Sequence, residues 1–371
     1  VTKRIIVDLD SAPYPTTPIV PSTEVVHDRV NLELFRGCVR GCRFCQAGYV
    51  YRPIRAKKPE TLVRQGIETL KNTGYQDVTL LSLSTSDYRP LAGLCDGLLE
   101  YCEPRSIELS LPSLRADNFS MELMEKLQKV RKSGLTFAVE GGSQRLRDAI
   151  NKNVTEEDLL HTCQIAFAGG WNSVKLYYML GLPTETDDDL SAIVDLCCKV
   201  RDAAGRGSPR LQVTCALSPF VPKPFTPFQW AEQISQDEIV RRVHVILEQA
   251  RPQKAITVRW HEPAVSHLEG ILSRAGREMA DCVERAYRKG AVFRSWMEHF
   301  SLEPWQEALR ECHLDEQSYI RKRDLDEPLP WDHLEAGIAN DFLKREWKRA
   351  LEGKRTADCR YARCNGCGCC D

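Results

Sequence analysis

The segment FRGCVRGCRFCQAGYVYRP carries three cysteines whose spacing could hold an inorganic cluster. Cys38, Cys42 and Cys45 follow the pattern C-x3-C-x2-C. Three thiolates leave one iron of a four-iron cubane without a protein ligand, and that open iron can bind a further molecule. Gly37 and Gly41 each precede a cysteine, as expected where a loop wraps closely around an inorganic core.

Two other interpretations fit three clustered cysteines. They could belong to a zinc site completed by a distant ligand, or be a disulfide pair with one free thiol. The chain has sixteen cysteines, no N-terminal apolar segment and no apolar run near 18 residues. This favours a reducing cytoplasm, without a membrane, in which thiols serve metals or the core. The spacing therefore favours the iron–sulfur interpretation.

The cysteine motif, with the aromatic Phe44 directly before its third cysteine, resembles that of the radical S-adenosylmethionine (SAM) enzymes. In that superfamily the amino and carboxylate groups of SAM chelate the open iron, and reductive cleavage of SAM gives a 5'-deoxyadenosyl radical. The resemblance implies a [4Fe-4S] cluster on Cys38, Cys42 and Cys45, which are then the catalytic centre. It also implies SAM as a cofactor, with Phe44 among the residues that contact it, and a one-electron reductant of flavodoxin or ferredoxin type.

Six short apolar runs indicate buried parallel strands. They are VNLELF (30–35), DVTLLSL (77–83), SIELSL (106–111), LTFAVE (135–140), SVKLYYML (173–180) and LQVTCAL (211–217). Amphipathic helices lie between them, one from Pro59 to Asn72 that stops at Gly74 and one with a capping-box-like start at Thr155. The alternation predicts an α/β fold, a partial (β/α)6 TIM-type barrel over residues 30–219, and the resemblance implies the same fold.

In such barrels the functional residues lie in the loops at the carboxyl ends of the strands. The cysteine loop follows the first strand, as this rule requires. By resemblance, residues in the loops after the next four strands contact SAM. They are Ser84, Thr85 and Ser86 after the second strand, Ser113 and Arg115 after the third, Glu140 after the fourth, and Gly181, Leu182 and Pro183 after the fifth.

The barrel pattern is flanked by two other regions. Residues 1–29 contain four prolines and predict an extended arm or linker. This arm resembles the segment that joins a cobalamin-binding-like domain to the radical SAM domain in a larger architecture, so cobalamin is expected only with such an upstream domain. Residues 220–371 read as mostly helical, with the best helices at Glu262–Lys289 and Asp332–Gly353. Whether the chain is a fragment or a shortened relative stays open.

The C-terminal unit ends in a second group of cysteines, in the tail 359–370. Cys359, Cys364, Cys367 and Cys370 follow the pattern C-x4-C-x2-C-x2-C, and the last three repeat at a ferredoxin spacing. Zinc modules more often pair two C-x2-C units across a longer loop. The tail therefore predicts an auxiliary [4Fe-4S] cluster, with a zinc site or an unstructured tail as alternatives.

The overall charge excludes a general affinity for nucleic acid, because 51 basic residues face 52 acidic ones. One local excess exists between Arg36 and Arg64, where eight basic residues are opposed by Glu60 alone. The simpler interpretation is a solvated face, with one or two arginines that hold SAM or cluster sulfides. The other is an electropositive rim that draws a phosphate-bearing substrate, such as RNA, to the cysteine loop.

These patterns lead to two function hypotheses. The first is a radical SAM enzyme that modifies a substrate, with RNA as one candidate and with methylthio or methyl transfer suggested by likeness to the methylthiotransferase-like branch. The second is an iron–sulfur electron-transfer or cluster-carrier protein without SAM catalysis. A carrier has no use for SAM-contacting residues at successive strand ends, so the loops favour the enzyme.

Overall fold

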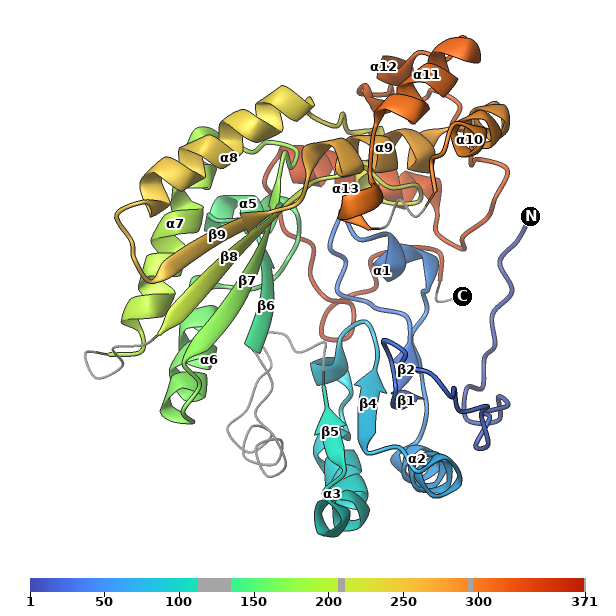
Figure 1. Ribbon diagram of the computed structural model, residues 1–371, viewed down its shortest axis with the longest axis vertical. Coiled ribbons are helices and arrows are strands. Elements are labelled where there is room, and N and C mark those ends of the chain that lie inside the picture. The colour runs from blue at the N-terminus through green and yellow to red at the C-terminus, as the bar shows by residue number, and fades with distance from the viewer. Residues whose placement is uncertain (112–134, 206–210, 293–295, 370–371) are drawn as a thin grey trace.

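The computed structural model describes residues 1–111, 135–205, 211–292 and 296–369, and Figure 1 draws its ribbon. Ser113, Arg115 and Cys370 lie outside the described residues, so their predicted roles stay predictions.

Two parallel sheets make up the centre of the fold. The first has the order β1–β4–β5, with β1 (Val30–Glu33), β4 (Asp77–Leu81) and β5 (Glu108–Ser110). The second has the order β6–β7–β8–β9, with β6 (Leu135–Glu140), β7 (Ser173–Leu180), β8 (Gln212–Pro219) and β9 (Ile256–Trp260). The predicted α/β class with parallel strands is confirmed. The segment between β5 and β6 lies mostly outside the described residues, and closure of the two sheets into a partial barrel stays a prediction.

Helices cover the outer faces of both sheets (Figure 1). On the first sheet these are α2 (Pro59–Thr73) and α3 (Leu91–Cys102); on the second they are α6 (Glu156–Ala168), α7 (Asp187–Asp202) and α8 (Gln236–Ala250). The apolar sides of strands and helices form one core for each sheet. Local sequence sets the helix ends: α2 ends at Gly74 in a left-handed conformation with φ 73°, and Thr155 caps α6 in a capping box with Asp158.

The C-terminal region differs from the sequence-based expectation in two ways. It contains β9, which extends the second sheet by one strand beyond the six predicted. Its helices are also shorter than predicted, and they are α9 (Pro263–Arg274), α10 (Met279–Arg288), α11 (Glu303–Glu311), α12 (Glu316–Ile320) and α13 (Asn340–Leu351). Residues 275–278, which include Gly276, separate α9 from α10 where one helix was expected.

A third core joins the C-terminal region to the ends of the strands. It contains Tyr49 from α1 (Gln46–Val50), Leu146 from α5 (Gln144–Ala149), and Trp347 from α13. Leu182, from the loop after β7, is buried in the same core. The C-terminal helix α13 therefore packs directly on the loops in which function was predicted.

The N-terminal arm, residues 1–29, contains no helix, and its first residues are attached to the rest of the chain. Thr2 forms a β-bridge with Glu335. The Lys3 ammonium donates hydrogen bonds to the carbonyl oxygens of Val50 (2.9 Å), Arg52 (2.7 Å) and Ala336 (2.7 Å). The arm thus contacts both the segment around α1 that follows the cysteines and the C-terminal region. In the described part of the chain, no helix has the length and apolar character needed to cross a bilayer.

Candidate metal centre and cofactor site

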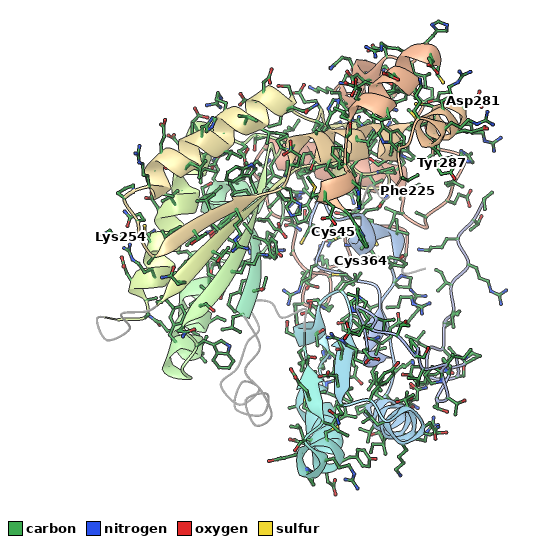
Figure 2. All side chains as sticks on the ribbon, viewed as in Figure 1. Cys45, Phe225, Lys254, Asp281, Tyr287 and Cys364 are labelled. Carbon is green, nitrogen blue, oxygen red and sulfur yellow. The ribbon has the colours of Figure 1, made fainter. Side chains whose placement is uncertain are left out.

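The three cysteines of the N-terminal motif lie in the loop that joins β2 (Phe35–Arg36) to α1. This loop, residues 37–45, is called the cluster loop below. Gly37 opens it with φ +99°, and a Cβ atom there would lie 2.5 Å from the carbonyl oxygen of Pro53, so only glycine fits. Cys38, Cys42 and Cys45 are free thiols, as are the other described cysteines, which rules out the disulfide interpretation for this loop (Figure 2).

The thiols of the cluster loop are suited to binding a metal. Burial, and then the neighbouring Cys42 and Cys38, raise the pKa of Cys45 to about 11. Such a thiol keeps its proton at neutral pH until a metal displaces it. In the described residues no three His, Cys, Asp or Glu side chains converge as ligands of a single ion. A cubane differs from a single ion because each cysteine binds a different iron, so three enclosed thiols at this spacing fit a [4Fe-4S] cluster.

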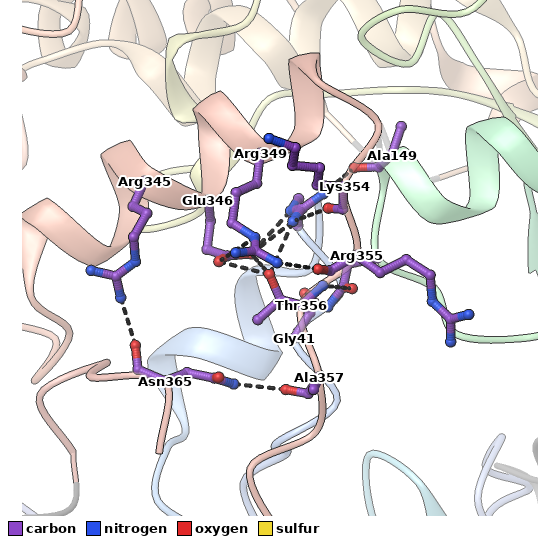
Figure 3. A network of polar contacts seen from close by, with 12 residues as sticks. Gly41, Ala149, Arg345, Glu346, Arg349, Lys354, Arg355, Thr356, Ala357 and Asn365 are labelled. Atoms are coloured by element: carbon purple, nitrogen blue, oxygen red, sulfur yellow. Dashed lines mark hydrogen bonds and ion pairs between the residues drawn. The ribbon is translucent and has the colours of Figure 1, made fainter. Parts of the chain in front are cut away.

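A buried ion pair holds the middle of the cluster loop (Figure 3). The guanidinium of Arg43, which has no exposed surface, donates from Nε (3.1 Å) and Nη2 (3.0 Å) to Oε2 of Glu346 in α13. Its Nη1 donates to the carbonyl oxygen of Ala149 in α5 at 2.7 Å. The hydroxyl of Thr356 donates to the same Glu346 carboxylate at 2.8 Å. A buried pair whose hydrogen bonds are this complete fixes the loop to two other elements.

A turn at residues 151–153 supports the loop from another side. The side-chain amide of Asn151 donates to the carbonyl oxygen of Gly41 at 3.1 Å, and its Oδ1 accepts from the N–H of Thr356 at 2.9 Å. Asn151 and Asn153 have φ of 54° and 53°, a left-handed conformation that asparagine tolerates better than most residues. The sequence NKN between α5 and α6 was the available signal for this turn.

Two predicted SAM-contacting residues, Phe44 and Glu140, are brought together by a lysine that the sequence did not single out. Lys152 pairs with Glu140 through an Nζ–Oε1 distance of 3.2 Å, and its Nζ lies 5.8 Å from the centre of the Phe44 ring. Lys152 also lies close enough to Cys45 for its charge to act on that thiol. Glu140 has φ 70° at the end of β6, a strained conformation of the kind found at functional sites.

The loop after β4 places its small residues in the interior. Ser84, Thr85 and Ser86 are all buried, and the Thr85 hydroxyl is already bonded to Ser82 at 3.0 Å. Asp87, next in sequence, forms an ion pair with Arg40 of the cluster loop. The predicted SAM loop after β4 and the cluster loop are therefore in direct contact.

The loop after β7 is also close to this site. Its predicted SAM-contacting residues differ in which of their atoms are available to a ligand. Leu182 is 3% exposed and packs in the third core, so only its backbone is available to a ligand, and neighbouring Pro183 is half-buried. The N–H of Gly181 donates to Oε2 of Glu185 at 2.6 Å, and Glu185 pairs with Arg242 of α8. Burial raises the pKa of Glu185 to about 7 in spite of these partners.

The C-terminal cysteines lie next to the cluster loop. The guanidinium of Arg52, which follows α1, lies over the ring of Phe342 in the core that also contains Cys367, and its charge acts on the Cys367 thiol. Cys359 lies within electrostatic range of both groups, whereas Cys364 is exposed (Figure 2). Cys369, which was not predicted as a ligand, is hydrogen-bonded to Cys367. Two cysteine groups far apart in sequence thus share one region of the molecule.

Most of the basic run between Arg36 and Arg64 has structural partners. Arg43, Arg52 and Lys57 are 0%, 5% and 6% exposed, and Arg36 pairs with Glu33 at 2.7 Å. Lys58 and Arg64 are exposed. The exposed members fit a solvated face, whereas Arg43 and Arg52 are buried.

Comparison with known families gives one match to a family model. Residues 32–197 match the model of the radical SAM superfamily.

Similar proteins include one from Methanocaldococcus jannaschii that bears the name of an uncharacterised protein. It is 32% identical over 250 residues, which are 67% of this chain and 52% of that protein. A tRNA-2-methylthio-N(6)-dimethylallyladenosine synthase of Lachnoclostridium phytofermentans is 23% identical over 215 residues, 54% of this chain and 45% of the enzyme. The chain spans about half the length of these curated relatives.

Among solved structures, similarity extends to a radical S-adenosylmethionine methyltransferase of Kitasatospora setae with cobalamin and a [4Fe-4S] cluster bound. That chain is 14% identical, the alignment covers 56% of this chain and 41% of the other, and the TM-score is 0.44.

Proposed function

We propose, from the premise that this chain belongs to the radical SAM superfamily of enzymes, that Cys38, Cys42 and Cys45 hold a [4Fe-4S] cluster at which SAM is cleaved. When bound and reduced, the cluster supplies one electron that splits SAM into methionine and a 5'-deoxyadenosyl radical, which abstracts hydrogen from the substrate. A flavodoxin- or ferredoxin-type protein is the proposed source of that electron. The two parallel sheets are proposed to form the partial barrel around the reaction.

The observation that carries this proposal is the meeting of three strand-end loops at the free thiols. The cluster loop contacts the loop after β4 through Arg40 and Asp87. It contacts the end of β6 through Phe44, Lys152 and Glu140. Since the carboxyl ends of parallel strands are where such folds bind ligands, this arrangement supports a cofactor beside the cluster.

Each of these residues has a proposed task. Lys152 holds the carboxylate of Glu140 directed toward the cluster loop, where it accepts hydrogen bonds from SAM. Phe44 and the buried serines after β4 enclose the cofactor and exclude water. The backbone at Gly181, Leu182 and Pro183 is proposed to contact the adenine side, since the Leu182 side chain is occupied in the core.

The proposed outcome is transfer of a methyl or methylthio group, with RNA as the candidate substrate. Support comes from relatives named as tRNA methylthio synthases, each matched over part of its length. The exposed Lys58 and Arg64 are the members of the basic run that remain available to phosphate groups.

The tail is proposed to hold a second [4Fe-4S] cluster through Cys359, Cys364, Cys367 and Cys370. The position of Cys367 beside Arg52 supports a site near the cluster loop. The anaerobically reconstituted protein should then contain roughly eight iron atoms per chain, the content of two cubanes.

The test of the enzyme is the yield of 5'-deoxyadenosine from SAM with dithionite-reduced protein. The triple variant Cys38→Ala, Cys42→Ala, Cys45→Ala should give none, while Cys95→Ala, which removes a thiol buried in the core of the first sheet, should retain the activity. SAM should also shift the electronic spectrum of the parent protein. An unchanged yield in the triple variant would refute the proposal.

A further inference from the structure

Arg52 is buried at the junction of the cluster loop and the C-terminal region. Its Nε donates to the carbonyl oxygens of Cys38 (3.2 Å) and Gly48 (2.9 Å). Its guanidinium carbon lies 4.9 Å from the centre of the Tyr49 ring and 6.0 Å from that of Phe342 in α13. Only 5% of Arg52 is exposed, so its charge has little help from water.

A buried guanidinium needs an anionic partner, which is usually a carboxylate. In the described part of the chain, Arg52 forms no ion pair with a carboxylate, whereas Arg43 in the same motif has Glu346. Carbonyl oxygens accept hydrogen bonds but do not cancel a full positive charge. The negative charge must come from another group at this position.

The groups that Arg52 reaches are sulfur atoms of the tail. Its guanidinium lies over the ring of Phe342, which shares a buried core with Cys367, and its charge acts on the Cys367 thiol, which is 6% exposed. Cys369 contacts Cys367, and its thiol donates to the carbonyl oxygen of Gly337 at 2.9 Å. Cys359 is within electrostatic range of both Arg52 and Cys367. Three of the four described tail cysteines therefore lie within electrostatic range of this one cation, and the fourth, Cys364, is exposed.

The backbone of the tail is fixed at the same point. The N–H of Ala339, at the start of α13, donates to the carbonyl oxygen of Cys367 at 2.9 Å. Gly368 has φ +88°, and a Cβ atom there would lie 3.2 Å from the nitrogen of Ala339. A side chain at position 368 would strain this contact, so the tail approaches α13 closely because it carries glycine there.

We propose that the tail cysteines form an anionic metal–thiolate centre whose counter-ion is Arg52 of the cluster-loop segment. The two metal sites then assemble as one unit, since the same guanidinium donates to the backbone of Cys38 and lies close enough to Cys367 for its charge to act on that sulfur. Thiolates bound to iron carry the negative charge that the buried guanidinium lacks. The inference rests on the proposed second cluster and adds Cys369 to the sulfur atoms that surround it.

The experiment compares Arg52→Gln, Arg52→Lys and the control Arg55→Gln in the full 371-residue chain after anaerobic reconstitution. The readouts are iron per chain and the electron paramagnetic resonance spectrum of the reduced protein with and without SAM. Arg52→Gln should lose about half of the iron and keep a signal that responds to SAM. Arg52→Lys, which keeps the charge, should retain more iron than Arg52→Gln, and Arg55→Gln should match the parent.

The outcomes distinguish a failure of this inference from a failure of the proposed second cluster. Parent-level iron and an unchanged spectrum in Arg52→Gln would show that Arg52 is not the counter-ion. Equal iron loss in the lysine and glutamine variants would assign Arg52 a packing role and also overturn the inference. A chain that ends at Ala357 and keeps all its iron would instead refute the second cluster, and loss of only the SAM-responsive signal in Arg52→Gln would place the effect on the cluster loop alone.

Discussion

Two segments of this chain carry clustered cysteines, and the protein surrounds them differently. The cluster loop is bonded by buried side chains from other elements, among them Glu346 of α13 and Asn151 of the turn before α6. The tail is bonded at Cys367 and Cys369, while Cys364 and the residues around it are exposed. The cluster loop is therefore ordered by the protein before a metal binds, and the tail depends more on its ligand for order.

The largest effect should come from breaking the ion pair beneath the cluster loop. Glu346→Ala leaves the fully buried Arg43 guanidinium without its carboxylate, which should cost about 3–5 kcal/mol of the free energy of unfolding. The measurement is urea unfolding of the metal-free protein under anaerobic conditions. Glu284→Ala is the matched control, because its ion pair with Arg288 is exposed and should contribute less than about 1 kcal/mol. Similar losses in the two variants would mean that the loop is not held in the way described.

A second prediction uses the pH dependence of stability to test the burial of Glu185 in the loop after β7. The pKa of Glu185 is raised from 4.5 to about 7, so the folded protein binds a proton there more tightly than the unfolded chain. Its contribution to stability is complete below about pH 4.5 and is lost as the pH rises to about 7, by about 3 kcal/mol at most. Glu185→Gln should flatten this part of the stability profile. A slope equal to that of the parent protein would contradict the raised pKa.

A smaller effect is expected at the turn that supports Gly41. Asn151→Gly removes the hydrogen bonds to Gly41 and Thr356 but tolerates the left-handed backbone, so it isolates the side chain. The free energy of unfolding should fall by about 1–3 kcal/mol. Asn151→Ala should fall further, because alanine adds backbone strain at φ 54°. An alanine variant as stable as the glycine variant would remove strain from the explanation.

The smallest effect on stability is expected in the tail. Cys364→Ser changes an exposed side chain and should alter the free energy of unfolding of the metal-free protein by less than about 0.5 kcal/mol. The same change should lower the iron content of the reconstituted protein, because Cys364 is one of the proposed ligands. A loss above about 1 kcal/mol without metal would show that the tail, like the cluster loop, is ordered by the protein itself.

The fold could be predicted in large part because its signals are local. Each of the six expected strands is an apolar run that the structure buries in a parallel sheet, and α2 and α6 begin and end where Pro59, Gly74 and Thr155 indicate. The strand β9 was missed because its run ITVRW is short and has one buried residue, Ile256. Its identity as a strand depends on pairing with β8, which the segment does not encode by itself.

The candidate site could be predicted only at its cysteines and strand-end loops. Phe44 and Glu140 do lie near the cluster loop, but the residue that joins them, Lys152, follows α5 in a turn without a distinctive pattern. Arg43 and Arg52 belong to a basic run that was expected to be mostly exposed, since charged residues are usually at the surface, and the sequence did not indicate which of its arginines are buried. Both are buried, because anionic or hydrogen-bonding partners arrive from elsewhere in the chain.

The sequence by itself determined which residues can do chemistry, because cysteine spacing and strand periodicity act over a few neighbouring positions. Only the tertiary structure decided how those residues are held. Arg43 and Glu346 are 303 positions apart, and Arg52 meets Cys367 across a similar separation. Whether a charge is exposed or buried depends on the partner that the fold delivers to it, and burying a charge without a partner is too costly to be stable. The partners that lie far away in the sequence therefore explain why this basic segment is buried beside the proposed metal site.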